Sequence, residues 1–265
     1  MTTESDEQVR TTYDGSTATI WLNRPGKRNA MNYSMWASLH DSALRLAGDP
    51  VVRVVVLRGA GEHFCAGADI TELRAPRRDD ERSFSDVNMD AESALVTLPK
   101  PTIAVVSGDC IGGGCALAID CDFRIATADA RFGITPSKLG IVYPSASLER
   151  ATQLLGPAVT KRMLFTGDLM TADEAWHVGL VDEIVDPAAL DGRLATLTGV
   201  LASRSLLTQA ATKAMVAEIM THGHVPASVR AHWNGVAARG SDSAEGIAAF
   251  VEKRPARFTW SGDGD

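Results

Sequence analysis

The sequence lacks any apolar run near the ~20 residues needed to cross a membrane. It also lacks an excess of positive charge, since 26 lysine and arginine residues stand against 33 acidic residues and the net charge is −7. An acidic chain is a poor general binder of nucleic acid, and any anionic ligand must meet a local basic cluster. We therefore expect neither a membrane nor a nucleic-acid partner.

Cysteine is scarce, with only 4 residues in the chain. Three of them (Cys110, Cys115 and Cys121) lie close together, but no histidine stands at metal-ligand spacing. We expect reduced thiols packed in a core and no metal site. Residues 1–8 are polar and acidic, unlike a secretory signal, and are expected to form a disordered leader of a cytoplasmic protein.

Glycine is concentrated in one motif. An apolar run at 101–106 predicts a buried strand, and it leads to Gly112, Gly113 and Gly114, followed by an apolar segment of helical length. Glycine lets a ligand approach the main chain, and the first N–H groups of a helix have no internal partner. Such a turn can bind an oxygen that carries negative charge, although a glycine triplet alone is equally compatible with a purely structural turn. No Gly-Lys-Ser or Gly-Lys-Thr follows, which excludes a P-loop.

A second glycine turn, at 66–68, also follows an apolar run and precedes a short expected helix. Two such turns from neighbouring strands can aim two backbone N–H groups at one point, which is the requirement for an oxyanion hole.

The rest of the pattern predicts alternating strands and helices with right-handed crossovers, followed by a helical appendage. We expect a hairpin at 9–13 and 17–22, a helix from Asn32 or Ser34 to about Leu46, and a strand at 51–57. A charged loop at 75–82, a helix at 83–98 and a strand at 122–126 follow. From 147 onward the pattern is mainly helical, with segments at 147–155, 157–165, 171–178, 187–203, 205–221, 225–239 and 242–252 and one apolar run at 180–185.

Several segments of the chain, taken in order, resemble those of the crotonase family, which contains the enoyl-CoA hydratases and isomerases. The similarity covers nearly the whole chain, and the matching segments are 22–25, 29–32, 64–70, 112–118, 130–133, 164–167, 179–181 and 250–254. The resemblance implies an α/β fold: a crotonase (ClpP-like) spiral of β-β-α units at 9–200 with a C-terminal helical trimerisation region at 201–265. It implies a homotrimer or a dimer of trimers.

The resemblance also implies an acyl-CoA thioester ligand, so that coenzyme A enters as part of the substrate and no separate cofactor is expected. Its thioester oxygen would lie between the backbone N–H groups of Ala68 and Gly113. Lys27 and Arg28 would lie near the CoA nucleotide, although by residue type alone they form an ordinary solvated loop. Lys253 would reach a phosphate from its own or a neighbouring subunit. The remaining residues that the resemblance places near CoA are Ala30, Ala66, Gly67, Asp69, Ile70 and Phe250.

The chain departs from the family's hydratase pattern at two positions. Hydratases of the family use two glutamates, and here those positions carry Ala116 and Pro136, which cannot move a proton. Thr135, followed by proline, and Tyr143, eight residues after Thr135, resemble the methylmalonyl-CoA decarboxylase branch, in which both lie near the acyl group. Decarboxylation needs no base, and an oxyanion hole stabilises the resulting enolate.

Asp120 lies one helical turn beyond Ala116 on roughly the same face and can serve as a proton carrier. The alternative for Asp120 is an ordinary polar contact at a helix end. His63, just before the first turn, is expected to face solvent. The sequence thus predicts a lyase that stabilises a thioester enolate, with Tyr143 and Thr135 facing the acyl group. Two alternatives stay open: a non-catalytic acyl-CoA binder, and a biosynthetic crotonase that forms or cleaves C–C bonds.

Overall fold

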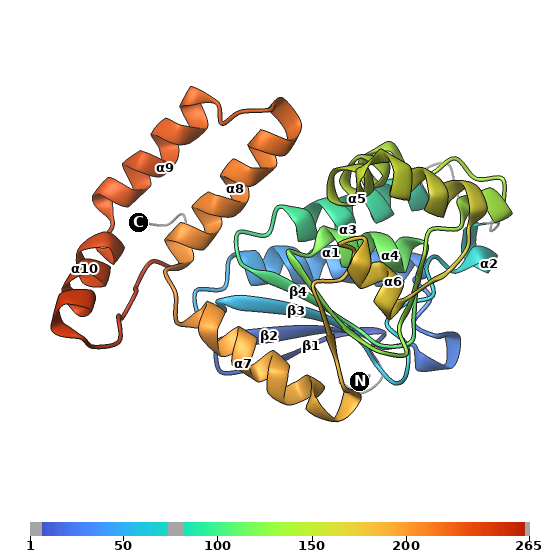
Figure 1. The fold of residues 1–265 in the computed structure, drawn as a ribbon, viewed down its shortest axis with the longest axis horizontal. Coiled ribbons are helices and arrows are strands. Elements are labelled where there is room, and N and C mark those ends of the chain that lie inside the picture. The colour runs from blue at the N-terminus through green and yellow to red at the C-terminus, as the bar shows by residue number, and fades with distance from the viewer. Residues whose placement is uncertain (1–6, 74–81, 263–265) are drawn as a thin grey trace.

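A six-stranded sheet forms the centre of the molecule in the computed structural model, which describes residues 7–73 and 82–262 (Figure 1). The strand order is β1-β2-β3-β4-β6-β9, and only the β1–β2 hairpin is antiparallel. The strands are β1 (Val9–Asp14), β2 (Thr17–Leu22), β3 (Val54–Gly59), β4 (Thr102–Val106), β6 (Phe123–Thr127) and β9 (Glu183–Val185). A small second sheet contains β5 (Asp109–Ile111), β7 (Arg131–Gly133) and β8 (Met170–Thr171).

Helices cover both faces of the large sheet, which explains why its central strands read as unbroken apolar runs. Along β3, Val55 and Leu57 point into the main core, which also receives helices α1 (Tyr33–Ala47) and α3 (Phe84–Val96). Val54 and Val56 point to the opposite face and pack with Leu190 of α7 (Leu190–Ala202). Figure 1 shows α7 on one face of the sheet and α1, α3 and α4 (Gly113–Asp120) on the other.

The expected helix starts are confirmed by their caps. Asn32 accepts a hydrogen bond from the Met35 amide at 2.9 Å and caps α1. The apolar side of this helix, formed by Met35, Leu39, Ala43 and Leu46, is fully buried. Ser83 and Asp86 form a capping box at the start of α3. The segments expected at 147–155 and 157–165 are the two helical stretches of α5 (Ser145–Thr166), which are separated at Gly156, where the backbone is not helical (φ 73°, ψ 165°).

The C-terminal helices extend away from the sheet, in the direction opposite to α2 (Ile70–Leu73) (Figure 1). They are α8 (Leu206–His222), α9 (Ala227–Arg239) and α10 (Asp242–Glu252), and they follow the expected segments closely. A small cluster of their own holds them together, formed by Leu206, Leu207, Ala210, Val236 and Trp260 with Trp233 packed against it. The remaining helix is α6 (Ala172–His177), and short 3-10 turns lie at Pro25–Lys27, Pro136–Lys138 and Pro187–Ala189.

The structure differs from the expectations at two points, and two further expectations are not tested by it. The strand expected at 51–57 begins at Val54, because Val51 is turned to solvent and the chain reaches the sheet only after Arg53. The strands of the small sheet have two or three residues each and were not predicted, because so short a run carries no periodicity. The leader expected at 1–8 and the loop expected at 75–82 lie almost entirely outside the described residues. Among those that are described, no helix is long and apolar enough to span a bilayer.

Candidate active site

The two glycine turns lie side by side, held by short stretches of parallel pairing. Residue 65 pairs with residue 110, since the Cys65 amide donates to Asp109 O and the Ile111 amide donates to Cys65 O, both at 2.9 Å. A second bridge joins Met31 to Ala68. The turn that ends β5 is thereby fixed against the turn that follows β3.

The amide of Ala68 lies close to Gly113. In the Met31–Ala68 bridge the bonds run from Met31 N to Gly67 O and from Asp69 N to Met31 O, so the Ala68 N–H points away from Met31. On that side lies Gly113, the first residue of α4, whose idealised Cβ position is 3.7 Å from Ala68 N. Neither amide donates to an acceptor in residues 7–73 and 82–262. Two neighbouring amides without an acceptor among the described residues can donate to a negatively charged oxygen.

Close backbone packing explains why glycine is needed in this pair of turns. Gly67 has φ of 95°, and a Cβ there would stand 2.7 Å from Ile111 O. A Cβ on Gly114 would stand 2.3 Å from Cys65 O. Side chains at either position would force the two turns apart.

Trp36, on α1, borders the amide pair and was not singled out in the sequence. Its ring atoms Cζ2 and Cη2 lie 3.2 and 3.5 Å from the idealised Cβ position of Gly113. The side chain is buried, and its indole Nε1 has no hydrogen-bond partner in the described chain. No sequence signal links Trp36 to the glycine turns, because the contact joins residues 77 positions apart.

Thr135 is brought to the same region through the small sheet. The Gly112 amide donates to Gly133 O at 2.8 Å, which ties the end of β7 to the glycine triplet. Thr135 follows two residues later and is half-buried, and Pro136 opens the 3-10 turn after it. Ala116 is buried on α4. Neither Ala116 nor Pro136, the two positions at which the sequence departs from the hydratase pattern, carries an ionisable group.

Tyr143 and Asp120 lie in the interior beside α4. The Tyr143 hydroxyl is buried and has no hydrogen-bond partner among the described residues. Burial is the main cause that raises the pKa of Tyr143 well above its usual value, and the nearby charges of Glu92 and Asp120 add to it. Asp120, the last residue of α4, forms a buried ion pair with Arg150 on α5 at 2.5 Å, which agrees with the alternative of a polar contact at the helix end.

Some of the residues expected near the CoA nucleotide form ion pairs or hydrogen bonds within the protein. Arg28 Nη1 pairs with Asp109 at 2.9 Å but keeps an exposed side chain, and Lys27 is exposed. The Asp69 carboxylate accepts hydrogen bonds from Thr71 Oγ1 and Arg24 Nη1, each at 2.6 Å. The Thr71 hydroxyl and then Arg24 lower the pKa of Asp69 to about 2. Asp69 therefore braces the turn that carries Ala68. Ala66 and Gly67 belong to this turn, Ile70 follows it, and Ala30 directly precedes Met31, which is bridged to Ala68.

Phe250 and Lys253 are not brought to the amide pair within one chain. Both lie at the C-terminal end of α10, at the opposite end of the molecule from α2 (Figure 1). Phe250 is 85% exposed, which is unusual for a phenylalanine.

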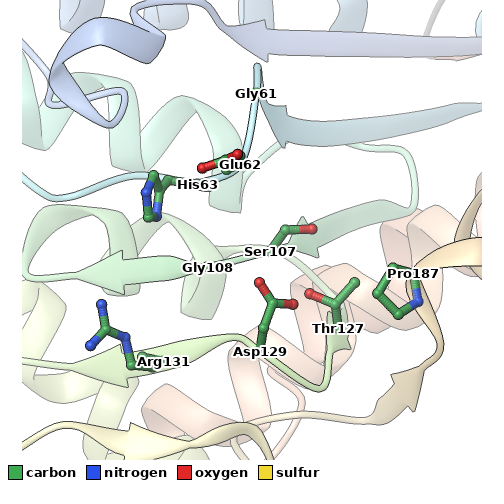
Figure 2. Close-up of a pocket in the computed structure, with 9 residues that line it drawn as sticks. All are labelled: Gly61, Glu62, His63, Ser107, Gly108, Thr127, Asp129, Arg131 and Pro187. Atoms are coloured by element: carbon green, nitrogen blue, oxygen red, sulfur yellow. The ribbon is translucent and has the colours of Figure 1, made fainter.

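A cleft of about 600 Å³ lies away from the amide pair, where strands of the large sheet bend into the small sheet (Figure 2). Its walls include His63, Ser107, Gly108, Thr127, Asp129 and Arg131. His63 does not simply face solvent as expected, because its Nδ1 accepts a hydrogen bond from the Asp109 amide at 3.0 Å. The carboxylate of Asp129 and the guanidinium of Arg131 share this cleft, so it has no single sign of charge.

Comparison with known proteins places the chain in a family. The enoyl-CoA hydratase/isomerase family model matches residues 12–261. A crotonyl-CoA hydratase from Syntrophomonas wolfei is 35% identical over 243 residues, covering 91% of this chain and 94% of that protein. A short-chain-enoyl-CoA hydratase from Clostridium acetobutylicum is 32% identical over 247 residues, covering 91% and 93%.

Solved structures agree with the fold expected from the sequence. The crystal structure of a putative enoyl-CoA hydratase/isomerase family protein from Hyphomonas neptunium superposes with a TM-score of 0.91 at 33% identity, over 97% of this chain and 100% of that one. The α/β crotonase fold with C-terminal helices is thereby confirmed. With matches along nearly its full length in both sequence and structure, the chain belongs to the enoyl-CoA hydratase/isomerase family.

Proposed function

We propose that this protein binds an acyl-CoA thioester with its carbonyl oxygen between the N–H groups of Ala68 and Gly113. The observation that carries the proposal is that these two amides lie side by side without a protein acceptor. Negative charge develops on the thioester oxygen when an enolate forms, and fixed donors aimed at that oxygen stabilise the charge without reorganisation.

We propose further that the reaction is the decarboxylation of a malonyl-type thioester. The bond between the α-carbon and the carboxylate breaks, CO2 leaves, and the electron pair passes into the enolate held by the two amides. This step needs no base, which suits Ala116 and Pro136. A carboxylate base would repel the substrate's own carboxylate. Tyr143 and Thr135 would face the acyl group.

Hydration is a second candidate, because the relatives described above are named hydratases. It requires a base to activate water and an acid to protonate carbon. Ala116 and Pro136 supply neither, so any hydration would depend on other groups near α4.

Turnover of a thioester panel separates these candidates. We expect the pure protein to release CO2 from malonyl-CoA or methylmalonyl-CoA and to hydrate crotonyl-CoA at least ~100-fold more slowly. Rapid hydration of crotonyl-CoA without CO2 release would overturn the decarboxylase proposal. Tight CoA binding with no turnover of any thioester would instead identify a non-catalytic binder, and a new C–C bond in the products would identify a biosynthetic enzyme.

We also propose that the complete CoA site needs more than one subunit, in a homotrimer or a dimer of trimers. Ile247, Phe250 and Val251 of α10 leave an apolar face exposed, with exposed fractions of 65%, 85% and 73%. A face of this kind on one helix suits burial against another chain. Lys253 at the end of the same helix would then reach a CoA phosphate held mainly by a neighbouring subunit.

A further inference from the structure

The cleft of about 600 Å³ described above lies at the carboxyl ends of four neighbouring parallel strands, β3, β4, β6 and β9 (Figure 2). Gly61 follows β3, Ser107 follows β4, Thr127 ends β6 and Pro187 follows β9, and all four line the cleft. In parallel α/β sheets, small molecules bind preferentially in crevices outside the carboxyl ends of the strands, and this volume is of the usual size. Among the residues that the structure describes, the lining includes none from the glycine turns at 66–68 and 112–114. The cleft is therefore a candidate site separate from the amide pair.

One end of the cleft carries positive charge that a buried carboxylate holds in place. The side chain of Asp109 is only 1% exposed, and its two oxygens accept from Arg131 Nη2 at 2.7 Å and from Arg28 Nη1 at 2.9 Å. Arg131 lines the cleft and Arg28 adjoins it through Asp109, and their side chains remain 53% and 61% exposed. Each guanidinium uses one nitrogen on Asp109, and its other N–H groups have no acceptor in residues 7–73 and 82–262. Two cations fixed by one anion leave one positive charge in excess, with N–H groups free for an incoming anion.

His63 adds a third hydrogen-bond donor at the same end. Its Nδ1 accepts from the Asp109 amide at 3.0 Å, so this nitrogen carries no proton and the proton of the neutral ring lies on Nε2. Gly108 makes this close approach possible, because its φ is 54° and a Cβ there would stand 2.6 Å from His63 Nδ1. Figure 2 shows His63 and Arg131 at the same end of the cleft. Guanidinium and imidazole N–H groups that line one cleft suit a phosphate or a carboxylate.

The other end of the cleft carries hydroxyl and carboxylate groups. Figure 2 shows Ser107, Thr127 and Asp129 grouped there, away from Arg131. Within the described segments, the carboxylates of Asp129 and of Glu62 on the cleft wall have neither a hydrogen bond nor an ion pair. A carboxylate repels an anion but accepts hydrogen bonds from the hydroxyl groups of a ligand, as acidic residues do with ribose in nucleotide sites. The two ends therefore require different groups on one ligand, an anionic group at Arg131 and hydroxyl groups at Asp129.

We propose that this cleft binds a sugar phosphate group, meaning a phosphate monoester on a sugar that keeps a free hydroxyl group. The phosphate lies against Arg131, Arg28 and His63, and a sugar hydroxyl lies against Asp129. Asp109 is a positioning residue, because it holds the two guanidiniums without contacting the ligand. The same chemistry occurs in a free nucleotide or sugar phosphate and in the 3′-phosphorylated ribose of CoA, and the experiments below separate these two sources. The inference does not depend on which reaction takes place at the amide pair.

The first test measures the binding of 3′-AMP, adenosine and inorganic phosphate to the full-length protein by isothermal titration calorimetry. We expect 3′-AMP to bind at least ~10-fold more tightly than adenosine, because adenosine lacks the phosphate. Arg131→Gln should remove most of this difference. Arg162→Gln, at an exposed position on α5, is the matched control and should bind 3′-AMP as the wild type does. Equal affinities for 3′-AMP and adenosine, or an unchanged affinity for 3′-AMP in Arg131→Gln, would overturn the proposal.

The second test examines the hydroxyl end of the cleft. Asp129→Ala removes an acceptor for a sugar hydroxyl, and it also removes a negative charge that opposes any anion. We therefore expect the affinity for 3′-AMP to fall about 5-fold relative to the affinity for inorganic phosphate, which has no sugar. If Asp129→Ala strengthens the binding of both ligands equally, Asp129 acts through its charge alone and the sugar part of the proposal is wrong.

The third test examines the positioning role of Asp109. Asp109→Asn removes a negative charge beside the phosphate, so a purely electrostatic role predicts tighter binding of 3′-AMP. We expect the opposite, about 10-fold weaker binding, because the two guanidiniums lose the carboxylate that holds them. If Asp109→Asn does not fold, Arg28→Gln removes one cation, leaves the Asp109–Arg131 pair in place and should also weaken the binding of 3′-AMP. Tighter binding in Asp109→Asn, or unchanged binding in Arg28→Gln, would contradict the proposal.

A competition experiment identifies the source of the phosphate. 3′-AMP is titrated into the protein saturated with butyryl-CoA. An unchanged affinity for 3′-AMP shows that a separate phosphorylated molecule occupies the cleft, whereas displacement shows that the 3′-phosphate of bound CoA fills it, and Arg131→Gln should then weaken the binding of butyryl-CoA as well. Either result supports the sugar phosphate chemistry of the cleft. Failure of butyryl-CoA to bind would count against the function proposed above and would leave the results with 3′-AMP intact.

Discussion

At the scale of single residues, the candidate site depends on positions that lack a side chain or an ionisable group. Gly114 has no side chain, and this lets Cys65 O approach the start of α4. Ala116 and Pro136 lack ionisable groups, so neither position can transfer a proton. The missing side chain of Gly114 allows the two glycine turns to pack closely. The missing ionisable groups at positions 116 and 136 limit the reactions that the amide pair can support.

Gly114→Ala should destabilise the fold by about 3 kcal/mol, because the added methyl group would meet a backbone oxygen at 2.3 Å. Gly192→Ala in α7 is the matched control, since a Cβ there meets nothing within 4 Å. That change should stabilise the helix by about 0.5–1 kcal/mol. Urea denaturation of the two variants measures the difference, and equal stabilities would contradict the packing argument.

If Tyr143 acts on the acyl group as proposed, Tyr143→Phe should lower kcat by about 100-fold or more and change KM little, because it removes the hydroxyl and leaves the ring packing in place. Tyr13→Phe, on an exposed strand position, serves as the control. Steady-state kinetics with a malonyl-type thioester provides the measurement. Full activity of Tyr143→Phe would remove this residue from the mechanism.

At the scale of elements, the short strands and the helix starts determine the position of the amides. The Met31–Ala68 bridge and the Cys65–Cys110 bridge each involve only a few residues, yet together they fix which way the Ala68 N–H points. The Arg24–Asp69 pair braces the same turn from outside, with Arg24 Nη1 2.6 Å from the carboxylate. Loss of this brace should affect both stability and the alignment of the turn.

Asp69→Asn should cost about 2 kcal/mol at pH 7, and the cost should shrink in acid. The pKa of Asp69 is lowered to about 2 in the folded protein, so its contribution is present above the unfolded value of about 4 and is lost as the pH falls toward 2. Urea midpoints of wild type and variant from pH 7 to pH 3 should therefore converge. The exposed Asp14→Asn provides the comparison, and a constant difference for Asp69→Asn would exclude the proposed linkage.

At the scale of the whole molecule, α10 lies far from the amide pair, and its apolar face is open. Within one chain, Lys253 therefore lies far from Ala68, although the resemblance places both residues at the same acyl-CoA ligand. The homo-oligomer proposed above would reconcile the two, because it would cover the apolar residues and bring a second chain to the site.

Lys253→Ala should raise KM for a CoA thioester several-fold and leave kcat nearly unchanged, because it removes a contact to phosphate and not to the acyl group. The same thioester on N-acetylcysteamine lacks the phosphates and should not be affected. Lys161→Ala, exposed on α5, is the matched control. Equal effects on both thioesters would show that Lys253 acts through folding or assembly and not through the nucleotide.

The sequence by itself determined the order and type of the main elements, because caps such as Asn32 and the apolar runs of β3 and β4 are local signals. It also indicated the two glycine turns and the loss of both glutamates. Only the tertiary structure decided that Trp36 borders the amide pair and that Glu92, Asp120 and Arg150 meet in one buried cluster. Those contacts join helices that are distant along the chain, and no periodicity or spacing within one segment records which distant side chain it will meet.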